Sequence, residues 1–142
     1  MSFLVDTNVF SESTKPQPAP LVQAWLAERS VDLYVSTLTI GELRFGIEKL
    51  PPGKRRAKLQ SWLNRTCEIM DGRILSVSTS VAHVWGQLRA KWTAEGVTMP
   101  AVDGLIAATA SRHGLVVVTR NEKNFDGSGV PTLNPFRPVD TP

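Results

Sequence analysis

The sequence predicts a three-layer α/β/α sandwich around a mostly parallel, roughly five-stranded sheet, formed by a single domain over residues 1–142. Segments rich in β-branched and aliphatic residues alternate with segments of helical periodicity along the chain. The best strand candidates, 3–5 and 115–119, are continuous apolar runs, which is typical of parallel strands covered on both faces. A length of 142 residues suits one domain with a proper core and is short for two.

The N-terminal third is predicted to contain two strands and one helix. Residues 3–5, FLV, form a short buried strand. The Pro-rich segment 15–20 is a loop, and a helix follows it from about Pro20, where apolar residues recur at helical spacing. The run LYVSTL at 33–38 combines β-branched and aromatic residues and is the second strand.

Two helices and a third strand are predicted in the middle of the chain. Apolar residues recur at the i, i+3, i+4 spacing across 39–50, and Thr39 is a suitable N-cap. The PPG segment at 51–53 ends this helix, and the helical pattern resumes over 54–70. The third strand is the short run ILSV at 74–77.

The C-terminal half is predicted to alternate in the same way. Residues 78–96 form a capped helix that ends near a glycine, and Pro100 begins another helix over 100–114. The clearest strand of the chain is LVVVT at 115–119, and 130–135 is a final edge strand.

Composition limits the classes of protein to which the chain can belong. Hydrophobic residues make up 42% of the chain and charged residues 20%, which is typical of a globular protein in water. No apolar run has the length of a membrane span, and no signal peptide is recognisable. Cys67 is the only cysteine, so internal disulfides and metal sites built on cysteine pairs are excluded, and we expect a cytoplasmic protein.

The chain is mildly basic, with a net charge of +3 and an isoelectric point of about 9.4. This small excess of positive charge is compatible with a nucleic-acid partner. The densest basic cluster is GKRRAK at 53–58. Two interpretations of this cluster remain open: a solvated helix start, or a phosphate-binding surface if it lies beside an active site.

Three acidic residues are predicted to meet at one edge of the sheet. In an open parallel sheet, sites form outside the carboxyl ends of the strands. Asp6 directly follows the first strand, and Glu42 lies in the first turn of the helix after the second strand. Asp103 lies in the first turn of a helix that leads antiparallel into the strand LVVVT, so it begins at the same edge. The loop 119–127 leaves that strand there as well.

Each acid also has a purely structural interpretation. The helix dipole favours an acid in the first turn of a helix, as for Glu42 and Asp103, and Asp6 could form a turn after its strand. Three carboxylates at one edge repel one another, however, and a divalent cation would remove that repulsion. Ligands that are all oxygens point to Mg²⁺ or Mn²⁺, and such an ion beside a basic surface suggests phosphodiester chemistry.

Four segments together resemble the PIN-domain family, and within it the VapC/FitB-type toxins of bacterial toxin–antitoxin modules. They are LVDTNVFSE, TIGELRFGIEKL, VDGLIAATASRHGLVVVTRNEKNF and the ending VPTLNPF, in the family's order and spacing over nearly the whole chain. The resemblance implies a Mg²⁺- or Mn²⁺-dependent endoribonuclease on a five-stranded parallel sheet, with RNA as its substrate. It also implies a homodimer and a VapB-like antitoxin that wraps the toxin and blocks its site.

The resemblance also implies roles for individual residues. The family's three acids match Asp6, Glu42 and Asp103. Asn8 matches the polar residue that orients the first aspartate, and Thr119 matches the hydroxyl after the fourth strand. We expect Asp6 and Asp103 to hold the ion directly or through water. Glu42 would orient or deprotonate the attacking water, or complete the shell of a second ion.

The fourth acid of many PIN domains has no clear counterpart here. The loop after the fourth strand offers Asn121 and Asn124, and its nearest acids are Glu122 and Asp126. An amide oxygen can bind Mg²⁺ or hold a metal-bound water but adds no negative charge. We therefore expect one ion to bind well and a second weakly, if at all. Asn121 and Thr119 would position a water or a phosphate oxygen.

Arg44 and Arg120 are the candidates for contacts with RNA phosphates. Arg44 lies two residues after Glu42, and Arg120 directly precedes Asn121. Ordinary salt bridges within the protein are the alternative for both arginines.

Two other classes of function remain open from the sequence. A catalytically weak PIN-fold module that binds RNA or protein would be compatible with the missing fourth acid, although the three retained acids argue against it. A haloacid-dehalogenase-like phosphatase or a receiver domain would also place an Asp after a strand. The phosphatase pattern needs a second Asp where Asn8 stands, and a receiver needs a Lys that the end of the strand 115–119 does not offer.

Overall fold

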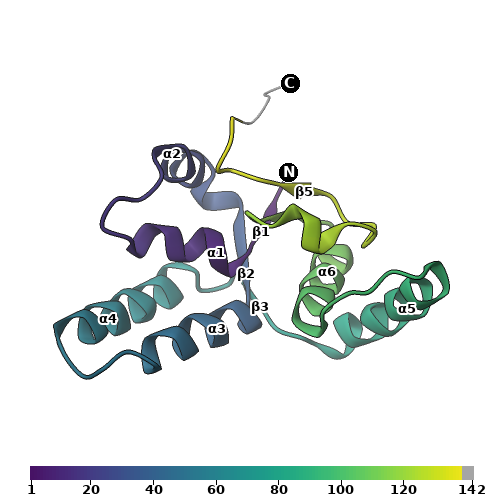
Figure 1. The fold of residues 1–142 in the computed structure, drawn as a ribbon, viewed down its shortest axis with the longest axis horizontal. Helices are drawn as coiled ribbons and strands as arrows, with labels where there is room; N and C mark the ends of the chain where they lie inside the picture. Colours follow the sequence, from purple (N-terminus) through teal and green to yellow (C-terminus); the bar gives the residue numbers. More distant parts are fainter. Residues whose placement is uncertain (139–142) are drawn as a thin grey trace.

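The computed structural model describes residues 1–138, which contain one five-stranded sheet (Figure 1). The strands are β1 (Phe3–Val5), β2 (Leu33–Ser36), β3 (Ile74–Leu75), β4 (Val116–Val118) and β5 (Thr132–Leu133). They lie in the order β3-β2-β1-β4-β5, and every neighbouring pair is parallel. The predicted parallel sheet is confirmed, with β1 at its centre.

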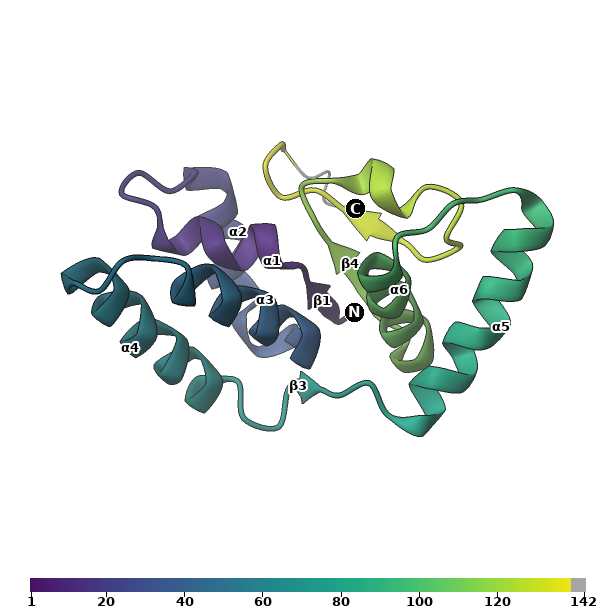
Figure 2. The ribbon, with the colours of Figure 1, turned by 60° about the horizontal axis from the view of Figure 1, so that its bottom comes forward.

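Helices cover both faces of the sheet, so the predicted α/β/α sandwich is also confirmed (Figure 2). The helices are α1 (Thr7–Phe10), α2 (Pro20–Glu28), α3 (Thr37–Glu48), α4 (Lys54–Ile69), α5 (Thr79–Glu95) and α6 (Ala101–His113). Four of them, α1 to α4, lie on one side of the sheet, and α5 and α6 lie on the other. No helix within residues 1–138 is long and apolar enough to cross a membrane.

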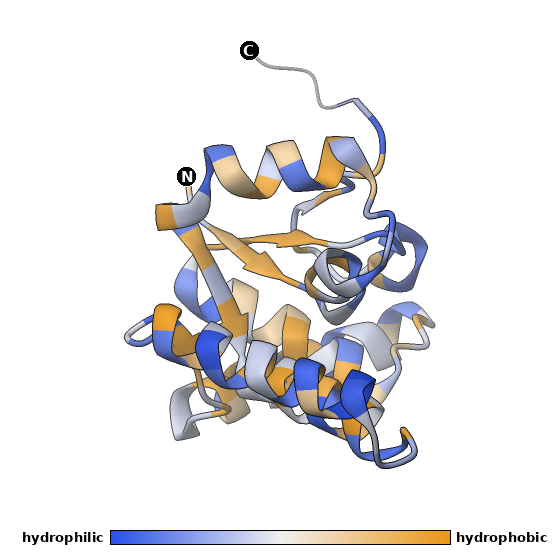
Figure 3. Cartoon of the chain, turned by 90° about the vertical axis from the view of Figure 1, so that its left-hand side faces the viewer, coloured by the Kyte–Doolittle hydropathy of each residue, from blue (hydrophilic) through white to orange (hydrophobic). Residues whose placement is uncertain are grey.

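The two faces of each strand contribute to two separate cores. Phe3 and Val5 of β1 pack with buried residues of α1 to α4, whereas Leu4 between them packs with α5 and α6. Val118 and Val117 of β4 divide between the two cores in the same way. In Figure 3 the strands are largely apolar, while the helices carry hydrophilic residues as well. This pattern is expected for a sheet that is buried on both sides.

The boundary between β2 and α3 differs from the prediction of a strand over 33–38 followed by a helix capped by Thr39. The strand ends at Ser36, and α3 begins at Thr37. The Ser36 hydroxyl caps the helix by accepting a hydrogen bond from the Leu38 N–H at 3.0 Å. Thr39 is a buried residue of the first turn. The serine cap outweighs the β propensity of the segment that follows it.

A short helix that the sequence pattern does not predict follows β1 directly. The Asp6 carboxylate accepts a hydrogen bond from the Thr7 N–H at 2.9 Å and so caps α1. With four residues, α1 is too short to show a helical repeat of apolar positions. A 3-10 helix at Ser11–Thr14 continues it toward the Pro-rich loop.

The two edge strands are shorter than predicted. The strand expected over 74–77 is confirmed only at Ile74–Leu75, and that over 130–135 only at Thr132–Leu133. Both strands pair on one side only, so fewer hydrogen bonds hold their ends in the ladder.

Candidate active site

Asp6 lies at the carboxyl edge of the sheet, where β1 ends. Its backbone N–H donates a hydrogen bond to the Val118 carbonyl at the end of β4, at 2.9 Å. Its side chain is half-buried. Two neighbouring strand ends therefore hold Asp6 at the place where ligand sites form in open parallel sheets.

Three groups donate hydrogen bonds to the Asp6 carboxylate. Oδ1 accepts from the Thr7 N–H at 2.9 Å. Oδ2 accepts from the Thr119 hydroxyl at 2.9 Å and from the Asn8 side-chain amide at 3.4 Å. The same Asn8 amide donates to the Thr119 oxygen at 3.2 Å. The structure thus brings the predicted site residues Asn8 and Thr119 together on Asp6 and orients its carboxylate.

The loop after β4 joins the same network through its backbone. The Arg120 N–H donates to Asn8 Oδ1 at 3.0 Å, and the Asn121 N–H donates to the Thr119 oxygen at 3.1 Å. Thr119 is fully buried. Residues from opposite ends of the sequence therefore form one hydrogen-bonded unit around the first acid.

Glu42 joins this unit through Thr7, a residue that the sequence analysis did not single out. The Thr7 hydroxyl donates to Glu42 Oε1 at 2.7 Å. Glu42 lies in the second turn of α3 and not in the first, because this helix begins at Thr37. The signal that could have identified Thr7 is its place between Asp6 and Asn8 in the first motif.

Asp103 lies in the first turn of α6, as predicted. Burial raises the pKa of Asp103 above its usual value, and the negative charges of Asp6 and Glu42 raise it further. The three predicted acids therefore influence one another electrostatically, although they come from three separate segments of the chain.

The donor chemistry of the three acids fits a hard divalent cation. Carboxylate oxygens are the ligands that Mg²⁺ and Mn²⁺ prefer, and the raised pKa of Asp103 indicates negative charge that a cation would balance. Within residues 1–138, no three Asp, Glu, His or Cys side chains lie close enough together to bind one ion at the same time. Mg²⁺ usually keeps several waters and contacts only one or two carboxylates, so this spacing is compatible with it.

Glu122, one of the two nearest acids in the loop after β4, is engaged away from Asp6. Its Oε2 accepts a hydrogen bond from the Thr132 hydroxyl of β5 at 2.7 Å, and its Oε1 pairs with Arg137. Since both oxygens have partners, Glu122 is a poor candidate for the fourth acid.

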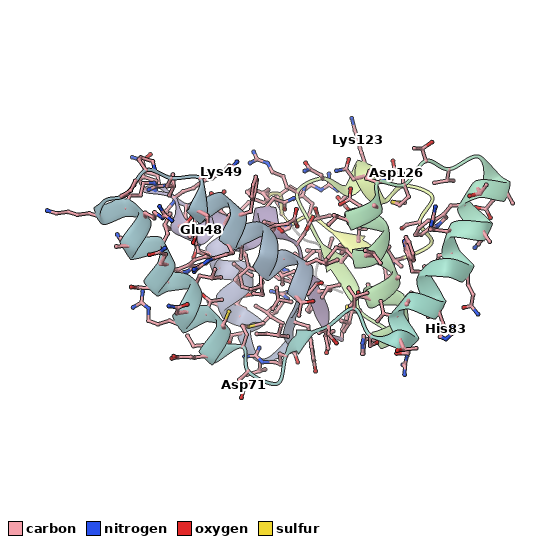
Figure 4. The ribbon with its side chains drawn as sticks, turned by 90° about the horizontal axis from the view of Figure 1, so that it is seen from below. Glu48, Lys49, Asp71, His83, Lys123 and Asp126 are labelled. Carbon is pink, nitrogen blue, oxygen red and sulfur yellow. The ribbon has the colours of Figure 1, made fainter. Side chains whose placement is uncertain are left out.

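Asn124 and Asp126 are both exposed in the same loop. In Figure 4, Asp126 and Lys123 of this loop lie at the edge of the molecule, and His83 of α5 lies on the opposite side. Within residues 1–138 no ion pair engages Asp126 elsewhere, so it stays a candidate for the fourth acid.

The two predicted RNA-contacting arginines have partners within the protein. Arg44 Nε lies 3.0 Å from Glu48 Oε1, one turn further along α3. The Arg120 guanidinium stacks on the Phe136 ring, 4.5 Å from its centroid. Both arginines remain exposed, so these contacts leave them accessible to a ligand.

The fold and the site define a class of protein: an α/β domain with three interacting carboxylates at the carboxyl edge of a parallel sheet. The model of the PIN domain matches residues 3–127. The chain therefore belongs to the PIN-domain family, which confirms the predicted resemblance.

Relatives in this family match the chain over most of its length. VapC ribonuclease Y4jK of Sinorhizobium fredii is 36% identical over 96% of this chain and 99% of its own. Toxin FitB of Neisseria gonorrhoeae is 39% identical over 94% of this chain and 97% of its own. A tRNA(fMet)-specific endonuclease VapC of Salmonella typhimurium is 30% identical over 89% of this chain and 91% of its own.

Solved structures share the fold. A structure of FitAB bound to a DNA fragment matches with a TM-score of 0.91 and 36% identity, over 97% of this chain and 98% of that one. FitAcB from Neisseria gonorrhoeae matches with a TM-score of 0.89 and 39% identity, over 94% of this chain and 98% of that one. These similarities confirm the predicted PIN-like architecture.

Proposed function

We propose that this chain is a Mg²⁺- or Mn²⁺-dependent endoribonuclease and the toxin of a type II, VapBC-like toxin–antitoxin module. The observation that carries the proposal is the set of hydrogen bonds that joins Asp6 to Glu42 through Thr7 at one sheet edge of a PIN domain. Asp103 lies near enough for the charges of both acids to raise its pKa. Relatives that span most of the chain are named VapC ribonuclease, toxin FitB and tRNA(fMet)-specific endonuclease. Their names support RNA as the substrate and hydrolysis as the reaction.

The three acids divide the work of hydrolysis. Asp6 and Asp103 would hold the divalent ion, which when bound supplies positive charge that acidifies water and stabilises the reacting phosphate. Glu42, held at Oε1 by the Thr7 hydroxyl, orients the attacking water or accepts its proton through the other oxygen. The products would carry a 5′-phosphate and a 3′-hydroxyl.

Asn8 and Thr119 act on the chemistry through Asp6. Both donate to Asp6 Oδ2, so each is a positioning residue for this carboxylate. The Thr119 oxygen also accepts from two N–H groups, which leaves this hydroxyl without capacity for the water or phosphate that we expected it to bind. Asn121, whose side chain is exposed, is left for that role.

A VapB-like antitoxin and a second copy of the chain are the expected partners. A similar structure is that of FitAB bound to DNA, which supports a protein partner for this chain. We place the module in the cytoplasm, where cellular RNA is available as substrate and a free thiol such as that of Cys67 stays reduced.

The test is cleavage of total cellular RNA by the purified chain in Mg²⁺, Mn²⁺ or EDTA. We expect cleavage that requires a divalent ion, and at least about a 100-fold loss of activity in Asp6→Asn and in Asp103→Asn. The ends of the products are analysed in the same reaction. A 2′,3′-cyclic phosphate would show that the RNA 2′-hydroxyl, and not water, is the nucleophile.

Calorimetric titration with Mn²⁺ distinguishes the remaining outcomes. Binding that Asp6→Asn abolishes, without cleavage, would confirm the metal site and direct the search to other RNA substrates. The absence of both cleavage and metal binding would contradict the proposal and favour the PIN-fold binding module.

A further inference from the structure

A groove leads away from the candidate active site between α1, α3 and α4. Its first part is a cavity of about 210 Å³ that Thr7 and Glu42 border at the site. Ile47 of α3 and Leu59 and Trp62 of α4 give this cavity apolar walls. The catalytic edge of the sheet is therefore continuous with an apolar depression on the surface of the helical layer.

The second part of the groove is basic. It is a cavity of about 350 Å³ bordered by Lys15, Arg55, Lys58 and Arg65. The two cavities have three lining residues in common, Thr14, Leu59 and Trp62. They are thus neighbouring parts of one groove, which runs from Glu42 at one end to basic residues at the other.

Three of these cations belong to one face of α4. Arg55, Lys58, Trp62 and Arg65 follow one another at intervals of three or four residues, which places them along a single stripe of the helix. The basic cluster that the sequence analysis left with two interpretations therefore lies beside the candidate active site. Its members Arg55 and Lys58 line the groove itself.

The cations of this stripe lack acidic partners. Within residues 1–138, Arg55, Lys58 and Arg65 form no ion pair, whereas their neighbour Arg56 pairs with Glu48. All three are exposed. An unbalanced positive charge at the end of a groove favours a polyanion as its ligand.

We propose that this groove binds the RNA strand beside the point of cleavage, with Arg55, Lys58 and Arg65 on its phosphates and an unstacked base against Leu59 and Trp62. The inference rests on the proposed ribonuclease function and names the residues that hold its substrate. The acids of the site repel phosphate until an ion binds, so the cations supply the attraction for the strand. The Trp62 ring beside the Leu59 side chain can stack against any base, because every base has a flat π-face.

The experiment measures RNA binding by the full chain in EDTA, which keeps the strand intact. The probe is a labelled single-stranded RNA of about 12 nucleotides, followed by fluorescence anisotropy over a range of salt concentrations. The test variant combines Arg55→Gln, Lys58→Gln and Arg65→Gln.

A control variant with the same loss of charge combines Arg89→Gln, Lys91→Gln and Arg112→Gln. These residues are exposed on α5 and α6, on the other side of the sheet. Circular dichroism and thermal unfolding show whether each variant folds. If the triple variant of α4 does not fold, the single exposed substitution Lys58→Gln replaces it.

We expect the α4 variant to bind RNA at least about tenfold more weakly at physiological salt. The slope of log affinity against log salt should shrink by about 2, since each phosphate contact of a single strand contributes about 0.7. Lys58→Gln alone should lower the slope by about 0.7. The control variant should bind like the wild type. In cleavage assays the α4 variant should show a raised KM with kcat unchanged, because these contacts lie away from the reacting atoms.

Several outcomes would overturn the inference. Equal affinity and equal salt slope in the α4 variant and the wild type would do so, and cleavage by the wild type would at the same time leave the proposed function intact. Equal losses in both triple variants would assign the effect to net charge and not to the groove. Unchanged RNA affinity with lost affinity for a polyglutamate peptide would assign the groove to an acidic protein segment. A wild-type chain that neither binds nor cleaves RNA would overturn the inference and the function together.

Discussion

The helices that carry Asp103 and Glu42 lie on opposite sides of the sheet, and α6 is more deeply buried than α3. Of the 13 residues of this helix, which carries Asp103, six are buried: Gly104, Ile106, Ala107, Ala108, Thr109 and Ala110. A Cβ built at Gly104 would lie 3.3 Å from a ring carbon of Trp92 on α5. The small residues of α6 let α5 approach closely, so Asp103 projects from a helix that packs tightly against its neighbour.

Helix α3, which carries Glu42, is more exposed than α6. Only three of the 12 residues of α3 are buried, and a Cβ built at Gly41, next to Glu42, would meet nothing within 4 Å. The groove and its exposed cations lie on the same side of the sheet as α3. Close packing thus fixes the helix of Asp103, whereas the helix of Glu42 borders the groove that we propose for the substrate.

The largest expected effect tests the difference in packing directly. Gly104→Leu should lower the free energy of unfolding by about 2 kcal/mol or more, because its side chain would press on Trp92 and Met99. Gly41→Leu should leave it unchanged or raise it by about 0.5 kcal/mol, since leucine favours a helix more than glycine does. Chemical denaturation measures both. Equal effects of the two substitutions would contradict the proposed difference in packing between α6 and α3.

The next largest effect concerns the hydrogen bond that the Thr7 hydroxyl, next to Asp6, donates to Glu42 of α3. Thr7→Val removes the hydroxyl that holds Glu42 Oε1 and should lower kcat about tenfold, the smaller end of the effect of losing a supporting hydrogen bond. Thr7→Ser keeps the hydroxyl and should retain most of the activity. If serine and valine lose activity equally, the methyl group of Thr7 matters and the hydrogen bond does not.

A smaller effect on stability should distinguish Asp103 from an ordinary surface acid. Because its pKa is raised in the folded state, the folded chain binds this proton more tightly than the unfolded chain does. Ionisation of Asp103 therefore destabilises the fold as pH rises through the raised pKa. Below the ordinary value of about 3.9, this destabilisation is absent.

Asp103→Asn should accordingly raise the thermal unfolding temperature of the metal-free chain at neutral pH, and the gain should vanish in acid. The measurement is thermal unfolding in EDTA across a pH series, with the exposed Asp71→Asn as the control. A gain that is equal at all pH values would show that the charge of Asp103 is not its cause.

The smallest effect is expected from Glu122, which belongs to neither layer. Its contacts with Thr132 and Arg137 turn it toward β5, so Glu122→Gln should change the cleavage rate by no more than about twofold. Asp126→Asn in the same assay tests the remaining acid of this loop. A tenfold loss in Glu122→Gln would restore Glu122 as the fourth acid.

The hydrophobic pattern of short sequence segments was sufficient to predict most of the helices and strands. The runs that became β1 and β4 are continuous and apolar because both of their faces are buried, so the parallel sheet was predictable. The four-residue helix α1 was not, since it is too short to show a period. The start of α3 was misplaced because Thr37 and Leu38 prolong the β-branched and aromatic run of β2 until the Ser36 cap is taken into account.

The sequence by itself determined the fold class and predicted that Asp6, Glu42 and Asp103 lie at one edge, because the topology of an open parallel sheet brings its strand ends together there. Only the tertiary structure decided the contact of Thr7 with Glu42 and the place of the α4 cations beside the site. These relations depend on packing between segments that lie far apart in the chain, and the spacing of residues along one segment carries no information about that distance.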